Sequence, residues 1–208
     1  MTELNHRSLS RRGLWLEYFT VAYNVFEAIV SIAFGAQANS AALLSFGIDS
    51  IVESLSALVL IWRLGRGTDD PERERQLEKI AIRLVAITFF VLGAYVLFDA
   101  ATGLFFKQVP EVSLPGIVIA VLSTIVMPLL ASQKHRIGQQ IGSKALIADS
   151  RETLACASLS VALLVGLLGN ALFGLWWMDG VAALVIGTWL VREGFENWYE
   201  ASEEEDED

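Results

Sequence analysis

Two carboxylates lie one helical turn apart inside an otherwise apolar run of this chain. Asp49 and Glu53 occur in the segment IDSIVES, within the run from 41 to 62. Residues at i and i+4 are neighbours on one face of a helix, and grouped carboxylates are ligands for metal cations. A second group with similar spacing occurs in the segment ADSRETLAC, and it comprises Asp149, Glu152 and Cys156.

A third polar stripe occurs near the start of the chain. Its members are spaced by three or four residues, which places them on one helical face. They are Glu17, Thr20, Asn24, Glu27 and Ser31. We expect Asn24 and Glu27, at mid-depth, either to support a metal site or to form a helix–helix hydrogen bond, and Glu17 to lie at the membrane interface.

These acids are expensive to place in a membrane. One charged side chain at the centre of a spanning helix costs about 2.5–3.5 kcal/mol, so Asp49, Glu53, Asp149 and Glu152 would together cost on the order of 10 kcal/mol. Basic partners are scarce at that depth, and Arg151 points about 100° away from Glu152 on a helix. Protonation, water or a bound cation must therefore compensate the carboxylates.

The elements that carry these residues are apolar segments long enough to span a bilayer, which takes roughly 20 helical residues. The chain of 208 residues is 54% hydrophobic and 19% charged, and its charges are clustered between apolar runs. We predict an all-α fold, a six-transmembrane helical bundle, with spans at 14–34, 41–63, 80–103, 114–132, 145–169 and 176–197.

Three regions follow from this pattern. Residues 1–13 are a cytoplasmic N-terminal segment, 14–198 form the six-helix transmembrane domain, and 199–208 form an acidic, disordered tail. The tail accounts for much of the net charge of −9, which also argues against a nucleic-acid partner. The single cysteine, Cys156, excludes an internal disulfide.

The distribution of Lys and Arg predicts the orientation. Three such residues precede the first span, five lie between the second and third spans, and three lie between the fourth and fifth. The opposite side has only Lys107. The positive-inside rule therefore places both termini in the cytoplasm.

The last span has a face of small residues, which favours close packing within the subunit or between subunits. The residues on this face are Gly180, Ala183, Gly187 and Gly194.

The motifs resemble those of the cation diffusion facilitators, six-helix exporters of divalent metals. The second span of that family carries D-x-x-x-D, which Asp49 and Glu53 match, and the fifth carries A-D-x-x-H-x-x-x-D. Here ADSRETLAC keeps the Ala-Asp start but has Glu152 in place of the histidine and Cys156 in place of the last acid. The segment WWMDG also resembles the W-A-D-P of the family. The usual C-terminal cytoplasmic domain is missing, so the chain resembles a short branch of the family.

The resemblance implies a divalent-cation exporter that exchanges metal for protons, with no prosthetic group. It implies metal binding between spans two and five by Asp49, Glu53, Glu152 and Cys156, with Asp149, Asn24 and Glu27 as candidate auxiliary ligands. Four ligands suit a tetrahedral zinc site, which puts zinc first. Manganese, iron, cobalt and cadmium stay open because three carboxylates and one thiolate are a harder set of ligands than zinc usually has. Glu152, in the position of the histidine, is expected to shuttle the proton. The resemblance further implies a homodimer that spans the plasma or inner membrane several times.

Other functions stay open. One is a membrane scaffold that transports nothing and pairs its acids with a partner, and another is a proton-coupled transporter of a small organic cation. No Ser/His/Asp set, phosphate-binding glycine loop or redox motif indicates an enzyme.

Overall fold

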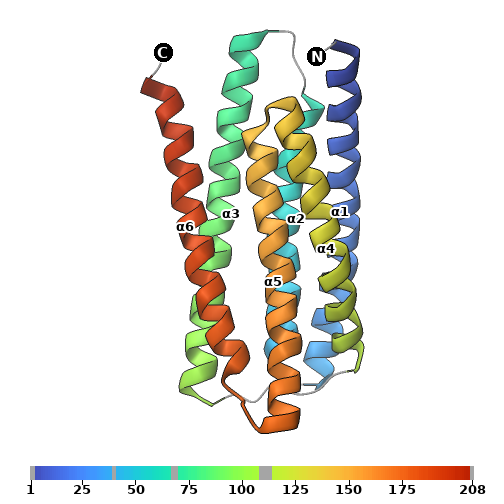
Figure 1. The fold of residues 1–208 in the computed structure, drawn as a ribbon, viewed down its shortest axis with the longest axis vertical. Helices are drawn as coiled ribbons and strands as arrows, with labels where there is room; N and C mark the ends of the chain where they lie inside the picture. Colours follow the sequence, from blue (N-terminus) through green and yellow to red (C-terminus); the bar gives the residue numbers. More distant parts are fainter. Residues whose placement is uncertain (1–2, 39–40, 67–69, 108–113, 207–208) are drawn as a thin grey trace.

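The structure is a computed structural model that describes residues 3–38, 41–66, 70–107 and 114–206. Across these residues the chain forms six α-helices and no strand, which confirms the predicted all-α six-helix fold. The helices are α1 (Glu3–Ala38), α2 (Ala41–Gly65), α3 (Pro71–Phe105), α4 (Leu114–Ile141), α5 (Lys144–Phe173) and α6 (Met178–Asp206). Both termini lie at the same end of the bundle, and we call this the terminal end (Figure 1).

The helices that carry the predicted metal ligands contact each other and their neighbours. α2 contacts α1, α3 and α5, and α5 contacts α2, α3, α4 and α6. α3 and α6 lie side by side along one flank, with α1 and α4 toward the other (Figure 1). The predicted ligands therefore lie on two helices that pack against each other.

The interior of the bundle combines an apolar core with buried polar side chains, and the exterior is apolar. On α1, Glu17, Asn24 and Glu27 are buried, whereas Trp15 and Phe26 are exposed. An apolar exterior suits lipid, and polar side chains must face inward because lipid cannot solvate them. Among the described residues, α1, α2, α3 and α4 each contain a stretch long and apolar enough to cross a membrane. The arrangement agrees with a bundle embedded in a bilayer.

The helices extend further at the terminal end than the predicted spans. α3 begins at Pro71 rather than at 80, and α4 continues to Ile141 rather than ending at 132. The start of α3 has a local cause, because Asp70 accepts a hydrogen bond from the backbone N–H of Glu72 at 3.1 Å. α4 ends at Gly142, whose φ of 73° favours glycine. Hydropathy predicts the part of each helix that lies in the bilayer. It does not predict the charged turns by which a helix continues beyond the bilayer.

The first and last helices also extend beyond the predicted spans. α1 begins at Glu3, so most of the N-terminal segment 1–13 is helical. α6 continues to Asp206, so the acidic segment 199–208 is helical to that residue rather than disordered. We expected disorder because this segment contains a run of like charges. Such a run does not show whether the preceding helix continues through it.

The small-residue face of α6 packs within the subunit, against α3. A Cβ added at Gly187 would lie 2.9 Å from the Cγ of Leu97, and one at Gly194 would lie 3.0 Å from the Cδ1 of Phe90. On the facing side, a Cβ at Gly93 would lie 2.8 Å from Val191. Glycines on both helices thus allow the close approach of α3 and α6.

Candidate metal-binding site

The predicted stripes of α1, α2 and α5 all face the interior. In α2 and α5, Asp49 is 2% exposed, and Glu53, Asp149, Glu152 and Cys156 are completely buried. The polar stripe of α1 is completely buried as well. The periodicity of three and four residues therefore identified the inward faces correctly.

The carboxyl groups of Asp49 and Glu53 lack ordinary partners. None of their four oxygens has a hydrogen-bond partner by distance and angle among the described residues. The thiol of Cys156 on α5 interacts electrostatically with both carboxyl groups and with that of Glu27. The structure thus brings together two candidate ligands from α2 and one from α5, around buried oxygens that no donor in the described part of the chain meets within hydrogen-bond distance and angle.

Glu152 lies one helical turn from Cys156 and has a partner on α3. The hydroxyl of Thr88 donates to Glu152 Oε2 at 3.0 Å, and the Oε1 atom has no hydrogen-bond partner among the described residues. Glu152 also interacts electrostatically with Glu53 across the α2–α5 interface. We name Asp49, Glu53, Glu152 and Cys156 the acid cluster.

Helix α1 places Glu27 next to the acid cluster and Asn24 about one turn before Glu27. Glu27 Oε2 accepts a hydrogen bond from Ser50 at 2.9 Å, and its Oε1 has no partner in the described part of the chain. Both side-chain atoms of Asn24 also lack a hydrogen-bond partner there. Asn24 therefore does not form the helix–helix hydrogen bond that was one expectation for it.

Asp149 has a different environment from the acid cluster. Its Oδ2 accepts from the Nζ of Lys134 at 2.6 Å, and its Oδ1 accepts from the hydroxyl of Ser56 at 2.6 Å. Basic partners were expected to be scarce at the depth of these acids, and the completely buried Lys134 supplies one. Each oxygen of Asp149 thus already accepts a hydrogen bond, and its role as an auxiliary ligand stays a prediction.

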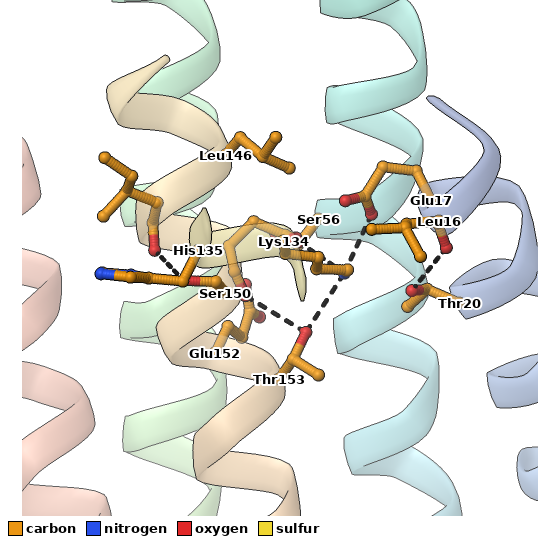
Figure 2. A network of polar contacts seen from close by, with 12 residues as sticks. Leu16, Glu17, Thr20, Ser56, Lys134, His135, Leu146, Ser150, Glu152 and Thr153 are labelled. Atoms are coloured by element: carbon orange, nitrogen blue, oxygen red, sulfur yellow. Dashed lines mark hydrogen bonds and ion pairs between the residues drawn. The ribbon is translucent and has the colours of Figure 1, made fainter. Parts of the chain in front are cut away.

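Lys134 also pairs with Glu17, which the sequence placed at the interface. The distance from Lys134 Nζ to Glu17 Oε2 is 2.9 Å, and Nζ also donates to Thr153 Oγ1 at 3.2 Å (Figure 2). Glu17 is completely buried, so its side chain faces the interior of the bundle and not solvent. One ammonium group on α4 thus links α1 and α5.

The sequence carried a signal for Lys134. If α4 is continued past 132, Lys134 follows the buried positions Ser123, Met127 and Leu130 at helical spacing. The charge of Lys134 was instead read as the beginning of a loop. The glycine at 142 was the better marker of the helix end.

Two further ion pairs fasten the helices outside this region. Glu78 on α3 pairs with Arg63 at 2.7 Å and accepts hydrogen bonds from Ser143 and from the N–H of Ala145, both at 2.8 Å. This contact ties the ends of α2, α3 and α5 together. Arg151 pairs with Glu193 on α6 at 2.7 Å. It does not pair with Glu152, in agreement with its predicted direction on the helix, about 100° away from Glu152.

The acid cluster is not closed around one point. Among the described residues, no three His, Cys, Asp or Glu side chains are close enough to hold a single metal ion. Its members are stacked in two layers along α2 and α5, since Glu53 and Glu152 lie a turn away from Asp49 and Cys156 on their helices. Ligation of one cation by all four groups would require the side chains to converge.

Comparison with known proteins identifies the group to which the chain belongs. Residues 18–204 match the family model of the cation efflux transmembrane domain. The chain is 23% identical over 185 residues to Transmembrane protein 163 of Xenopus laevis, covering 88% of this chain and 65% of that protein. It is 24% identical over 186 residues to the manganese efflux system protein MneS of Bacillus subtilis, covering 87% of this chain and 63% of that protein.

A third relative is archaeal. The chain is 22% identical over 182 residues to the uncharacterized transporter MJ0449 of Methanocaldococcus jannaschii, covering 85% of this chain and 64% of that protein. The chain thus spans somewhat less than two thirds of the length of each of these relatives. The family match itself extends over most of the chain, through all six helices. The chain therefore belongs to the cation efflux family.

Proposed function

We propose that this chain exports a divalent metal cation from the cytoplasm in exchange for protons, and that the cation binds at the acid cluster between α2 and α5. The observation that carries the proposal is the pair of buried carboxyl groups, Asp49 and Glu53, whose four oxygens lack hydrogen-bond partners among the described residues. A buried polar atom without a partner costs free energy. A bound cation would recover that cost, and membership of a family of transporters supports the same interpretation.

The donor atoms favour a cation that accepts many oxygen ligands. Asp49, Glu53, Glu152 and Glu27 supply carboxylate oxygens, and Cys156 supplies the only sulfur among them. Carboxylates suit manganese, whereas thiolate favours zinc. We therefore propose Mn²⁺ as the first substrate and Zn²⁺ as the second. The name of the relative MneS, a manganese efflux protein, agrees with this order.

The exchange with protons follows from the same burial. A carboxyl group without a partner in a membrane is more stable neutral, with its proton, than ionised. Metal ligands must be deprotonated, so a cation that binds displaces protons. Glu152 is the group to which we assign the shuttle role, since Thr88 holds one of its oxygens and leaves the other open.

We also propose that the chain acts as a homodimer in the plasma or inner membrane, with both termini in the cytoplasm. The family resemblance supports the dimer and the membrane. The placement of both termini at one end of the bundle agrees with the orientation from the positive-inside rule (Figure 1).

Equilibrium titration of the purified chain with Mn²⁺, Zn²⁺, Fe²⁺, Co²⁺ and Cd²⁺ tests the binding site. Asp49→Ala and Glu152→Ala each remove a proposed ligand. We expect Kd to rise by more than the roughly 10–100-fold that follows loss of a group outside the ligand shell. Cys156→Ser should weaken Zn²⁺ binding more than Mn²⁺ binding.

The control is Glu196→Ala, which removes an exposed carboxylate that pairs with Arg192 on the same helix. It should bind metal as the wild type does. If none of these cations bound the wild type, the scaffold function would remain in place of metal binding. If both Asp49→Ala and Glu152→Ala bound metal with wild-type affinity, the acid cluster would be excluded as the site.

A further inference from the structure

The ammonium group of Lys134 lies in a cage of oxygen atoms. Its Nζ is 2.6 Å from Asp149 Oδ2. It is also 2.9 Å from Glu17 Oε2 and 3.2 Å from Thr153 Oγ1 (Figure 2). Lys134, Glu17, Asp149 and Thr153 are all completely buried. We name Glu17, Asp149 and Thr153 the Lys134 cage.

The surroundings of Lys134 contain more carboxyl groups than one ammonium group can pair. Glu53 also interacts electrostatically with Lys134, and neither of its oxygens has a hydrogen-bond partner among the described residues. The Oε1 atom of Glu17 also lacks a hydrogen-bond partner there. Three buried carboxyl groups therefore face one positive charge, and oxygen atoms remain open beside it.

The ligand types of the cage are those of a cation site. Two carboxylates and a hydroxyl, completed by water, are the donors that hard and intermediate divalent cations such as Mn²⁺ accept. The hydroxyl of Ser56 donates to Asp149 Oδ1 at 2.6 Å and fixes the orientation of that carboxylate. We infer that the Lys134 cage is a second cation-binding site, which the ammonium group occupies in this conformation and which a divalent cation occupies when Lys134 withdraws.

The position of the cage gives the second site a role. On α5, Asp149 lies about one turn before Glu152 and about two turns before Cys156, on the side of the terminal end. On α2, Ser56 lies on the same side of Glu53. A cation moving between the terminal end and the acid cluster therefore passes the cage. This role rests on the proposed function, in which the terminal end faces the cytoplasm.

Lys134 then acts as a tethered competitor for the cage. The incoming cation displaces the ammonium group from Glu17 and Asp149, and Lys134 returns when the cation moves on to the acid cluster. Glu53 belongs to both surroundings, since it interacts with Lys134 and with the thiol of Cys156. If Lys134 only neutralised Glu17 and Asp149, its removal would not create a site for a second cation. The number of cations bound without Lys134 therefore distinguishes the two roles.

The test counts Mn²⁺ ions bound to the full chain in lipid nanodiscs at low Mn²⁺ concentration, from the electron paramagnetic resonance signal of free Mn²⁺. Lys134→Met removes the competitor, and Lys134→Met combined with Asp149→Asn also removes a cage ligand. We expect one ion for the wild type, two for Lys134→Met and one for the double variant. Equal stoichiometry in Lys134→Met and the wild type would overturn the second site.

The two proposals fail separately. A wild type that binds no ion contradicts the acid cluster as the metal site, whereas the difference of one ion between Lys134→Met and the double variant tests the cage alone. Lys134→Met leaves two buried carboxylates unpaired, so it is purified with Mn²⁺ present, which should take the place of the lost ammonium.

A second measurement covers the case in which Lys134→Met does not fold. At high Mn²⁺ concentration the wild type should bind a second, weaker ion as Mn²⁺ displaces Lys134. The double variant, which carries no unpaired charge at Asp149, should not. Saturation of the wild type and the double variant at the same stoichiometry would reject the cage as a cation site.

Discussion

Asp149 on α5 differs from Asp49 and Glu53 on α2 in its hydrogen-bond partners, and this difference gives the carboxyl groups different roles. Asp149 has both oxygens occupied, by Lys134 and by Ser56, and acts as a counter-ion. None of the four carboxyl oxygens of Asp49 and Glu53 has a hydrogen-bond partner by distance and angle among the described residues, and the thiol of Cys156 interacts electrostatically with both groups. At equal burial, a group with partners is held in one geometry, whereas a group without partners is available to a ligand.

At the residue scale, Glu152→Gln should uncouple metal flux from the proton gradient. Glu152 faces Asp149 on its own helix, Glu53 on α2 and the hydroxyl of Thr88 on α3. The amide retains the size of the side chain but cannot exchange a proton. We expect Mn²⁺ flux into proteoliposomes to fall and to lose its dependence on the pH gradient.

The matched control is Glu193→Gln, which makes the same change at the carboxylate that pairs with Arg151 on the α5–α6 contact. Its flux should keep the pH dependence of the wild type. If Glu152→Gln also keeps that dependence, another group shuttles the proton.

At the scale of helices, the sequence was sufficient for the number, order and inward faces of the elements. Apolar runs separated by charge clusters identify membrane spans, and the spacing of Glu17, Asn24 and Glu27 identifies the buried face of α1. Hydropathy did not locate the ends, because α3 and α4 continue as helices beyond the apolar runs. The error mattered at Lys134, which appeared to lie in a loop and is buried in α4.

The pairings across helices could not be predicted in the same way. The bonds from Lys134 to Glu17 and from Thr88 to Glu152 join residues far apart in the chain. Periodicity tells which face of a helix points inward, but not which helix it meets. Only the packing of α4 against α1 and of α3 against α5 determines these partners.

The contact of α3 with α6 gives a prediction at this scale. In Gly93→Ala the new Cβ would lie 2.8 Å from Val191 Cγ2 and 3.2 Å from the backbone N of Val191, so the helices must separate. Overpacking of this kind costs about 1–3 kcal/mol, of which roughly 1 kcal/mol is offset by the higher helix propensity of alanine. We expect a lower Tm for thermal unfolding in detergent.

Gly65→Ala is the comparison, since a Cβ at Gly65, at the end of α2, meets no atom within 4 Å. Its Tm should equal or exceed that of the wild type. Equal changes in Tm for the two variants would mean that close packing of α3 and α6 does not contribute to stability.

For the whole molecule, the arrangement of charge explains how so many acids are accommodated in an apolar bundle. Carboxylates line the inside from Glu17 near the terminal end to Glu27 further along α1, and apolar side chains such as Phe26 face outward. One buried lysine compensates part of this charge. The remainder requires protons or a metal cation, and their exchange is the transport cycle that we propose.

Transport itself is the most direct test of this account. The full chain is reconstituted into proteoliposomes with an imposed pH gradient, and Mn²⁺ uptake is followed with a metal-sensitive dye sealed inside. Wild type is compared with Asp49→Asn combined with Glu53→Gln, which removes both unpartnered acids without changing their size. Glu196→Gln serves as the control on the exposed side of α6.

The account predicts Mn²⁺ uptake by the wild type and by Glu196→Gln that rises with the pH gradient, and uptake by the double variant equal to that of empty liposomes. Undiminished, gradient-driven uptake by the double variant would contradict a cation site built on Asp49 and Glu53.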